Sequence, residues 1–365
     1  MLTIKKVLIV TTTGLGYEGI AGVIFNYLKN MDLSEIKLDF VLSRPTIDFV
    51  KEEIKKIDAN LYLINNRTNN PFLYIKNLRK IIEKNHYDIV HVHGNSATMY
   101  FDIHAARLAG VPVRIAHTHS SSCKSRIVHE MLKPLLKREL THAFACSDLA
   151  GKFVFNDNFD IVYNGVDIEK FLYNSKVRAE YREKLGLTDN FVLGHIGYFS
   201  DVKNHDFLID VFNEVYKLNP KARLLLIGDG GNLKPIIQEK VKSFCLEKFV
   251  LFLGKRNDVN MLMQALDVFL LPSKYEGLPV SLVEAQCSGL HCFISDTITK
   301  DVEATDRLHY MSLKESCSVW ANEILKFNDG YERRDVKDKI FNSHFNIKNE
   351  ARKLQEFYLE IEKSI

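Results

Sequence analysis

The sequence predicts an α/β protein built from two doubly wound domains, each a parallel sheet covered by helices. A chain of 365 residues is long enough for two compact units. Short, nearly continuous apolar runs alternate with amphipathic stretches, and this alternation is typical of parallel strands buried on both faces. The alternation stops near residue 165 and then begins again, so we expect two units of similar size.

The first series of apolar runs predicts one parallel sheet. Strands are expected at Lys6–Thr12, Lys37–Leu42, Asn60–Leu63, Tyr87–Val92, Val113–His117 and Ala143–Cys146. Amphipathic stretches between these runs predict helices, among them Ala21–Lys29, Phe72–Lys84 and Thr98–Leu108. Strands that alternate with helices in this way make one doubly wound domain, which we place at residues 1–166.

The second series begins after the turn residues Asn164–Asp167. Strands are expected at Phe191–Ile196, Leu224–Ile227, Phe249–Phe252, Val268–Leu271 and Cys292–Ile294. Helices are expected at Asp206–Leu218, Leu233–Phe244 and Val280–Ser288. These elements predict a second domain at residues 167–345. A charged helix at residues 346–365 follows, and we expect it to cross back to the first domain.

Composition and charge exclude several classes of protein. With 46% hydrophobic and 26% charged residues, the chain can bury sizeable cores, which a disordered protein cannot. A formal net charge of +3 argues against a dedicated nucleic-acid binder. The apolar run Val7–Val10 is too short for a secretory signal, and no run approaches the roughly 18 residues of a membrane span. The six cysteines include no C-x-x-C pair, so we expect reduced thiols and a cytoplasmic location.

A glycine-rich loop, Gly14–Gly19, follows the first predicted strand and reads G-x-G-x-x-G. Asp39 stands about twenty residues further on, as a dinucleotide-binding fingerprint requires. However, Thr11–Thr13 lengthen the loop, and Asp39 lies inside its strand instead of at the tip. We therefore favour a loop that faces another anion or a sugar. A nicotinamide enzyme and a purely structural turn remain the alternatives.

Eight of the thirteen histidines lie between residues 86 and 142. His91 and His93 close one predicted strand, and His117 and His119 close another, where polar residues line the binding crevice of an open α/β sheet. Strand alternation places His117 and His119 on one side. We interpret His91 and His117 as core histidines bonded to backbone carbonyls, and His119 as the functional candidate. Carboxylates and thiols at ligand spacing are missing beside these pairs, which disfavours a metal site.

Two carboxylates, Glu276 and Glu284, flank the start of a predicted helix with seven residues between them. Pro279 fits the first turn of this helix, and Gly277 frees the loop before it. Glu284 leans back toward the same end, where the first backbone N–H groups of the helix also point. Amide donors for phosphate and carboxylate acceptors for hydroxyls suit a sugar nucleotide. An ordinary strand–loop–helix unit is the alternative.

These residues resemble a known family of enzymes. Glu276 and Glu284, with the surrounding residues 272–285, resemble the E-x7-E signature of the retaining nucleotide-sugar glycosyltransferases of family 4, such as those of bacterial capsule and exopolysaccharide synthesis. Further matches, in chain order, are Asn164–Asp167, Gly197 with Lys203-Asn204, Leu226–Gly230 and Phe252–Gly254. They cover nearly all of residues 160–300. The N-terminal half resembles the family more loosely, through the glycine loop and the strand end at His119.

The resemblance implies the GT-B fold, in which two Rossmann-like doubly wound domains face a central cleft. The implied reaction moves a sugar from a nucleoside-diphosphate sugar to a hydroxyl of a glycan or lipid-linked acceptor, with retention at the anomeric carbon and with neither a metal nor a cofactor. The first domain would serve the acceptor and the second the donor. A sugar-nucleotide epimerase of the same fold is one alternative.

The resemblance also implies roles for individual residues. Lys203 would neutralise the departing diphosphate, Glu276 would contact the donor sugar, and His119 would reach that sugar from the other domain. Glu284 would accept hydrogen bonds from the ribose hydroxyls. The implied catalytic residues are thus His119, Lys203 and Glu276, and the donor-binding residues are Gly16, Gly197, Tyr198, Lys203, Gly228, Asp229, Lys255, Arg256, Gly277, Leu278, Val280 and Glu284.

One position departs from the family pattern. Tyr198 stands where the family usually has an arginine paired with the lysine. The loss of one of two cations beside a diphosphate weakens leaving-group stabilisation. Lys274 or Arg256 would have to compensate. If neither does, a non-catalytic partner of another transferase is the second alternative.

A basic stretch, Lys124–Leu140, mixes cations with leucines and a methionine. Such a helix can lie on an anionic membrane surface, or it can simply pack its leucines on the sheet. The half to which it belongs is the more basic one, since residues 1–166 carry 21 Lys and Arg against 16 Asp and Glu. Attachment to the inner face of the cell membrane is therefore a further hypothesis.

Overall fold

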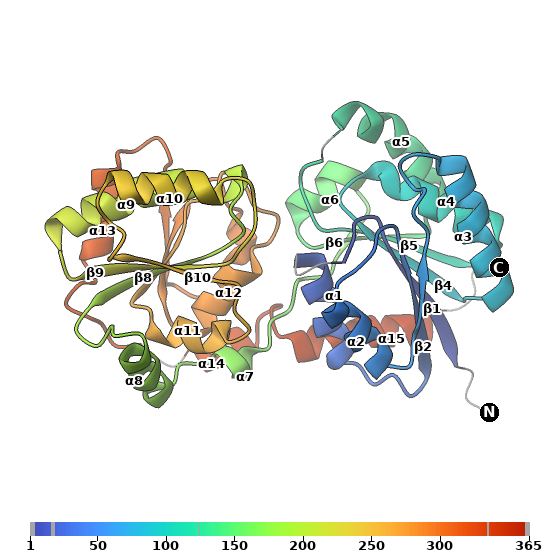
Figure 1. The fold of residues 1–365 in the computed structure, drawn as a ribbon. Helices are drawn as coiled ribbons and strands as arrows, with labels where there is room; N and C mark the ends of the chain where they lie inside the picture. Colours follow the sequence, from blue (N-terminus) through green and yellow to red (C-terminus); the bar gives the residue numbers. More distant parts are fainter. Residues whose placement is uncertain (1–3, 16–18, 124, 334–335, 362–365) are drawn as a thin grey trace. The chain divides into compact units, whose positions relative to one another are not determined.

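The computed structural model describes residues 4–15, 19–123, 125–333 and 336–361 (Figure 1). The chain divides into two compact units. One runs up to Gly165 and takes in the final helix from Ile347, and the other runs from Val166 to Asn346. Each unit is a parallel sheet between helices, as the sequence predicts.

The N-terminal unit contains a seven-stranded parallel sheet in the order β3-β2-β1-β4-β5-β6-β7. Its central strands are almost completely buried because their apolar runs are covered on both faces. The strands are β1 (Lys5–Thr11), β2 (Ile36–Leu42), β3 (Asn60–Leu63), β4 (Ile89–Gly94), β5 (Val113–Thr118), β6 (His142–Ala145) and β7 (Asp160–Ile161).

Two layers of helices cover this sheet, with α3 to α6 on one face and α1, α2 and α15 on the other (Figure 1). Tyr74 and Leu78 of α3 and Ile103 of α4 are fully buried and pack on Leu8 and Val10 of β1. The helices are α1 (Gly19–Lys29), α2 (Asp48–Lys56), α3 (Pro71–Asn85), the 3₁₀ turn η1 (Ala97–Met99), α4 (Tyr100–Leu108), α5 (Arg126–Glu139), α6 (Asp148–Phe155) and α15 (Ile347–Glu360).

The C-terminal unit contains a six-stranded parallel sheet in the order β10-β9-β8-β11-β12-β13. The strands are β8 (Phe191–Ile196), β9 (Ala222–Ile227), β10 (Val250–Gly254), β11 (Val268–Leu271), β12 (His291–Ser295) and β13 (Leu308–Met311). The helical segments are α7 (Ile168–Phe171), α8 (Ser175–Lys184), η2 (Asp201–Lys203), α9 (His205–Leu218), α10 (Lys234–Ser243), α11 (Val259–Ala265), α12 (Val280–Cys287), η3 (Lys300–Val302), α13 (Cys317–Leu325) and α14 (Lys337–Phe341).

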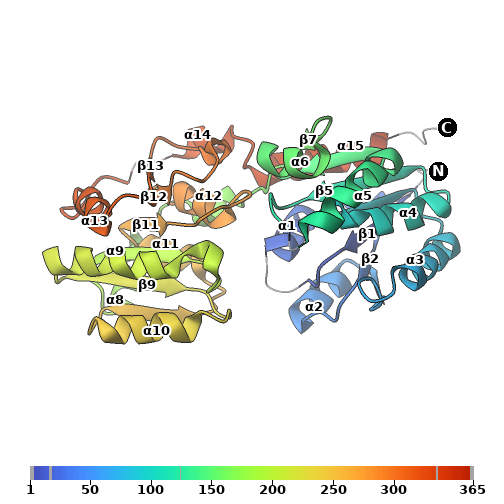
Figure 2. The same cartoon turned by 90° about the horizontal axis from the view of Figure 1, so that it is seen from above.

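Helices α9, α10 and α13 share one face of this sheet, while α8, α11 and α12 lie on the other (Figures 1 and 2). Trp320 of α13 is buried against the α9 side, and its indole Nε1 donates to Ser312 O at 3.0 Å. Neither α13 nor β13 was among the elements that the apolar pattern predicts. Strand β13 is short and carries polar side chains, so its pairing with β12 defines it more than its sequence does.

The strand order reverses once in each sheet, between β1 and β4 in the N-terminal unit and between β8 and β11 in the C-terminal unit. In open α/β sheets, ligands bind at the carboxyl ends of the strands beside such a reversal. The loops that follow β1 and β4, and those that follow β8 and β11, are therefore the places to look for a functional site.

All six cysteines lie in described ranges, and their thiols are free. No helix in the described parts of the chain combines the length and the apolar character that a membrane span requires.

Candidate functional site

In the C-terminal unit, the loops that follow β8 and β11 are tied together by two hydrogen bonds. Lys274 N donates to Val202 O at 2.8 Å, and Asn204 Nδ2 donates to Pro272 O at 3.1 Å. Asn204 has a left-handed backbone (φ 54°), which an asparagine adopts more readily than most residues. The adjacency of β8 and β11 thus brings two distant segments of the chain to one place.

Lys203 and Glu276 meet at this place. Lys203 Nζ lies 2.7 Å from Glu276 Oε1, although 73 positions separate the two residues in the chain. Only 20% of the lysine side chain and 13% of the glutamate side chain are exposed. A charge-assisted bond in such a sheltered position is short and directional, so each side chain holds the other in place.

The glycines around Lys203 lie where two backbone segments, or the backbone and the lysine side chain, approach each other too closely for a Cβ atom. A Cβ on Gly228, whose φ is 138°, would lie 2.1 Å from Gly197 O, so the loops after β8 and β9 touch there. A Cβ on Gly197 would lie 3.2 Å from Cγ and Cδ of Lys203. These glycines allow the two loops and the lysine stem to approach one another closely at the strand end.

Tyr198 is 53% exposed, and its ring lies against the loop after β9. A Cβ on Gly230 (φ 78°) would lie 2.6 Å from the ring. The tied loops contain a second lysine besides Lys203, Lys274, whose Nζ lies 2.6 Å from the exposed carboxylate of Asp201. Exposed pairs of this kind are weak. The ammonium group of Lys274 is therefore not committed to a strong partner by this pair.

Arg256 is held more firmly. Its guanidinium donates to both carboxylate oxygens of Asp258, at 2.7 and 2.6 Å, and Tyr181 also donates to that carboxylate. The arginine lowers the pKa of Asp258 to about 2. Of the two cations that could compensate for Tyr198, Arg256 already has a bidentate partner, whereas Lys274 does not.

Helix α12 begins at Val280, as predicted, and only the place of Pro279 differs. Pro279 is not in the first turn but caps it, with an extended ψ of 101°, and its carbonyl accepts from Leu282 N at 3.0 Å. The first N–H groups of a helix, those of Val280 and the next residue, have no acceptor within the helix. Gly277 precedes the cap, and the buried Leu278 side chain anchors the loop.

Glu284 lies one turn into α12. Burial raises the pKa of its carboxyl group to about 7, against the opposing effect of Lys170 on α7. The carboxyl group is therefore partly protonated at neutral pH. Hydroxyl donors bound to it would favour the ionised form.

The remaining donor-site candidates lie in the loops after β9 and β10. Asp229 accepts from Gly230 N at 2.8 Å and pairs with Lys234 at 2.6 Å. Lys255 is exposed and directly follows Gly254, which ends β10 with a φ of 64°. These residues border the glycine contacts described above, because β9 and β10 pair with each other beside β8.

Two further residues beside this site were not among the candidates that the sequence predicts. His195 Nε2 is buried without a hydrogen-bond partner among the described residues, and it lies 2.8 Å from the Cβ position of Gly197. The buried Ser273 Oγ, which precedes Lys274, also lacks a partner in the described ranges. Strand alternation would have found His195, since it points to the same side of the strand end as Gly197.

In the N-terminal unit, the loops after β1, β4 and β5 adjoin. Thr12 N donates to His93 O at 3.0 Å, and His119 N donates to Gly94 O at 3.0 Å. A Cβ on Gly94 would lie 2.7 Å from Thr12 Oγ1, so only glycine fits there. Gly16, the other donor-binding candidate of this unit, lies outside the described residues.

Asp39 has a structural role in the described sheet. Its carboxylate accepts from Asn60 N at 2.7 Å and from the Tyr87 hydroxyl at 2.6 Å, and the side chain is buried within β2. These bonds occupy both oxygens, which a ribose would need. The bonds support the interpretation of Asp39 as a strand residue.

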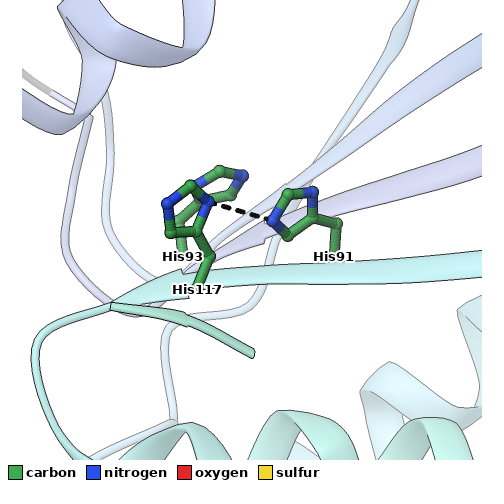
Figure 3. Close-up of side chains that lie close together, drawn as sticks. All are labelled: His91, His93 and His117. Atoms are coloured by element: carbon green, nitrogen blue, oxygen red, sulfur yellow. Dashed lines mark hydrogen bonds between the residues drawn. The ribbon is translucent and has the colours of Figure 1, made fainter. Parts of the chain in front are cut away.

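Four histidines of β4 and of the end of β5 form two bonded pairs. His91 Nε2 lies 3.2 Å from His117 Nδ1 (Figure 3), and His93 Nδ1 lies 2.9 Å from His119 Nε2. Burial lowers the pKa of His119 and of His91 to about 3. The imidazoles are therefore neutral at physiological pH. The predicted alternation is confirmed, since His117 and His119 stack at 4.2 Å.

The expected partners of the two core histidines were wrong. His91 and His117 are buried as predicted, but their ring nitrogens bond to each other and not to backbone carbonyls. The other nitrogen of His91 lies 2.6 Å from the hydroxyl of Tyr358 on α15. Because α15 comes from the far end of the chain, no local pattern could identify this partner.

Three of these histidines lie as close together as residues that bind one metal ion. Ligand nitrogens of His91, His93 and His117 lie within 4.8 Å of one another (Figure 3). The rings of His91 and His117 are nearly coplanar, at 13°, and their facing nitrogens are already engaged with each other. Ligands of one ion would instead direct their lone pairs to a common point.

Two family models match the chain. The model described as "Glycosyl transferases group 1" matches residues 177–305, and the one described as "Glycosyltransferase Family 4" matches residues 18–170. The first of these matches lies within the C-terminal unit, and the second covers most of the N-terminal unit and ends a few residues past Gly165.

Two relatives match over most of their length. A putative glycosyltransferase of Bacillus subtilis (strain 168), EpsF, is 35% identical over 338 residues, which are 88% of this chain and 87% of that protein. An Escherichia coli protein named UDP-Gal:alpha-D-GlcNAc-diphosphoundecaprenol alpha-1,3-galactosyltransferase is 26% identical over 364 residues, 92% of either chain.

Solved structures share the arrangement of strands and helices. Anabaena Alr3699/HepE in complex with UDP and glucose has a TM-score of 0.81 at 17% identity, over 98% of this chain and 100% of that one. Sucrose-phosphate synthase from Thermosynechococcus elongatus has a TM-score of 0.72 at 14% identity, over 97% and 98%. At these identities the likeness concerns the fold.

Proposed function

The chain belongs to the group 1 glycosyltransferases, and from this premise we propose that it transfers a sugar from a UDP-sugar to a hydroxyl of a lipid-linked glycan. Its two Rossmann-like domains are those of the GT-B fold. The proposed setting is surface polysaccharide synthesis, because the Escherichia coli relative is named for a lipid-linked acceptor. The proposed location is the cytoplasmic side of the cell membrane.

One observation carries the proposal for the donor: a lysine and a carboxylate, Lys203 and Glu276, are in contact beside the start of α12. A diphosphate needs a cation and backbone donors, whereas a sugar needs acceptors for its hydroxyls. Lys203 and the amides of Gly277, Leu278 and Val280 supply the donors. Glu276 supplies the acceptor.

In the proposed reaction, Lys203 stabilises the charge that develops on the leaving diphosphate, and Glu276 orients the donor sugar. Glu284 accepts hydrogen bonds from the ribose hydroxyls. Gly197, Tyr198, Gly228 and Asp229 line the diphosphate side of the site, and Lys255 with Arg256 frames the base. His119 of the N-terminal unit contacts the donor sugar.

The proposed mechanism is a concerted substitution on one face of the sugar, with retention of configuration. The bond from the anomeric carbon to the phosphate oxygen breaks as the bond to the acceptor oxygen forms, and the departing phosphate takes the acceptor's proton. A pair of carboxylates does not by itself imply a covalent intermediate. A glycosyl adduct on Glu276, detected by mass spectrometry of trapped protein, would contradict this mechanism.

Calorimetric titration with UDP-, GDP- and ADP-sugars tests the donor assignment. We expect a UDP-sugar to bind with a Kd in the micromolar to millimolar range of typical substrates, on the order of 10 to 1,000 μM. UDP is expected because the Escherichia coli relative is named for UDP-Gal and the Anabaena structure holds UDP. Incubation with that donor and a lipid-linked sugar should then give a product with the donor's anomeric configuration, read by proton NMR.

The same experiment separates the alternatives. An epimerase would convert the donor without an acceptor, and a non-catalytic partner would bind the donor but transfer nothing. The non-catalytic alternative arises because Tyr198 replaces the usual arginine. Lys274 is our candidate for the missing cation, since its backbone bonds to Val202, next to Lys203, and its side chain pairs with an exposed carboxylate. Absence of binding to every sugar nucleotide would overturn the proposal.

Helix α5 is the proposed membrane contact. Its exposed face carries Ile127 (77% exposed) and Met131 (69% exposed) beside the exposed Lys137 and Arg138. Lys124, from the same stretch, lies outside the described residues. Apolar and basic side chains on one exposed face are typical of helices that lie in an anionic interface.

Charge reversal at Lys133, Lys137 and Arg138 is expected to abolish binding to anionic vesicles, with a loss of about 1 kcal/mol per cation. Sedimentation with vesicles that contain phosphatidylglycerol measures the bound fraction, which should also fall with salt. Reversal at Lys76, Lys80 and Lys84, exposed on α3 of the same unit, is the matched control and should have a smaller effect. Binding that is absent, or insensitive to salt, would contradict the membrane assignment.

A further inference from the structure

The two histidine pairs at the ends of β4 and β5 have the same geometry. The rings of His91 and His117 are inclined by 13° and those of His93 and His119 by 20°, so each hydrogen bond lies near the plane of both rings. The pairs also stack on each other, with His91 over His93 at 4.2 Å. The four rings form a compact array in which no ring can turn without breaking a bond.

The atoms in contact restrict where the protons lie. A bond between two neutral imidazoles needs one N–H and one bare nitrogen. In the second pair the contact joins Nδ1 of His93 to Nε2 of His119. Both rings must therefore carry the proton on the same kind of nitrogen, since a mixed pair would oppose two N–H groups or two lone pairs. The proton position on His119 is thus coupled to that on His93.

Burial keeps this pair neutral, because it lowers the pKa of His119 to about 3 and that of His93 well below its usual range. What can still vary in this neutral pair is which ring nitrogen of each histidine carries the proton. The Nε2–H form is the more stable tautomer of a free neutral histidine side chain. With both protons on Nε2, His119 donates to His93 and its own Nδ1 stays bare.

His119 Nδ1 is buried and has no hydrogen-bond partner among the described residues. His119 N also donates to Gly94 O at 3.0 Å, which fixes the backbone from which the ring projects. The ring is therefore held on one edge by His93 and presents the other edge as an unsatisfied acceptor. An unsatisfied acceptor of this kind calls for a donor from outside the protein.

We propose that His93 is a positioning residue that holds the proton of His119 on Nε2, so that Nδ1 of His119 accepts a hydrogen bond from a hydroxyl of the donor sugar. This inference rests on the proposed assignment of His119 to that sugar. It makes His119 a neutral acceptor that orients the sugar, while Lys203 alone of the proposed catalytic residues supplies positive charge to the leaving group.

Long-range proton–nitrogen correlation spectra of histidine-labelled protein, without substrate, test the coupling directly. We expect His119 to show a protonated Nε2 and a bare Nδ1. In His93→Phe, which keeps an aromatic ring in the stack but removes the acceptor, His119 should show both tautomers. In His93→Asn, whose amide oxygen can take the place of Nδ1, the Nε2–H form should return.

Transfer assays should follow the spectra. We expect His93→Phe to lower kcat/KM about 10- to 100-fold through misorientation of His119, with UDP affinity unchanged. His93→Asn should restore most of the rate. His91→Phe is the matched control, because His91 lies two residues earlier on the same strand face and pairs with His117, so the His119 spectrum should stay as in the wild type.

Three results would overturn the inference. The first is a proton on Nδ1 of His119 in the wild type, and the second is an unchanged His119 spectrum in His93→Phe. The third is stoichiometric Zn²⁺ that shifts the signals of His91, His93 and His117 together, because the array would then be a metal site. If the spectra are as expected but the protein transfers no sugar, the coupling between His93 and His119 is supported and the proposed function is contradicted.

Discussion

Replacement of Lys203 by alanine is expected to lower kcat/KM for sugar transfer about 100- to 1,000-fold, the usual cost of removing one preorganised group that stabilises developing charge. The expectation is at the high end because Tyr198 stands where a second cation would help. Lys203 is also sheltered, with 20% of its side chain exposed, so its charge is weakly screened by water. Steady-state assays with the donor found by calorimetry measure the effect.

Lys217→Ala is the matched control for this substitution. Lys217 lies on the same stretch of chain, at the end of α9, and its Nζ is also 2.7 Å from a glutamate, Glu214. Its side chain is 58% exposed, so its pair contributes little to stability. We expect unchanged kinetics. A Lys203→Ala protein that keeps its fold by circular dichroism and loses less than about threefold would contradict the assigned role.

Glu284→Gln is expected to stabilise the protein and to weaken donor binding, two effects of opposite sign. Because burial raises the pKa of Glu284 from its ordinary 4.5 to about 7, the folded protein binds this proton more tightly than the unfolded chain. The resulting stability is fully present below about pH 4.5 and is lost as the pH rises to 7. A shift of this size corresponds to about 3 kcal/mol at pH 8, which glutamine would recover.

Denaturant unfolding at several pH values measures this effect. The free energy of unfolding of Glu284→Gln should exceed that of the wild type by about 3 kcal/mol at pH 8, and the difference should vanish near pH 4. Glu323→Gln on α13 is the control, because the side chain of that glutamate is 40% exposed and forms an ion pair with the exposed Lys326. Its stability should change by no more than about 0.5 kcal/mol.

Donor affinity should change in the other direction. A carboxylate can accept a hydrogen bond from each of two ribose hydroxyls, while glutamine offers one oxygen and no charge. We expect the Kd of the donor to rise about 10- to 100-fold in Glu284→Gln. In the wild type the Kd should rise as the pH falls below 7, because protonation removes the acceptor, and in the variant it should not. Unchanged affinity at pH 8 would remove Glu284 from the donor site.

Such a pattern would explain why a costly carboxyl group is kept at this position. A buried group that loses stability when it ionises is retained only where ionisation serves another purpose. Hydroxyl donors from a bound ribose would offset the cost by stabilising the carboxylate. Glu284 would then strengthen donor binding at a cost to the stability of the donor-free protein.

Two buried central strands were predicted with their observed bounds. The structure places β8 and β11 at the predicted residues, because a strand covered on both faces is a continuous apolar run and needs no partner to be recognised. The largely exposed edge strand β3 was also predicted with its observed bounds. The short strands β7 and β13 were not predicted. They carry few apolar residues, and their partners β6 and β12 define them.

The candidate site shows the same division. Glu276, Glu284 and Lys203 were identified from turn residues, spacing and family resemblance. Their contacts were not, since the bond between Lys203 and Glu276 exists only because β8 and β11 are neighbours in the sheet. His91 was likewise predicted to be buried, but its partner Tyr358 lies 267 positions away.

The sequence by itself determined the two α/β units, the positions of their main strands along the chain and the chemical types at the strand ends. Local patterns carry this information, because burial repeats with the period of a strand or a helix and turns need glycine, proline or asparagine. Only the tertiary structure decided which charged groups touch, which nitrogen of His119 is held by His93, and how far burial shifts the pKa of Glu284. Hydrogen bonds and pKa values depend on the groups that distant segments of the chain place within a few ångströms. The order of the strands in the sheet determines which segments are neighbours, and no local pattern encodes that order.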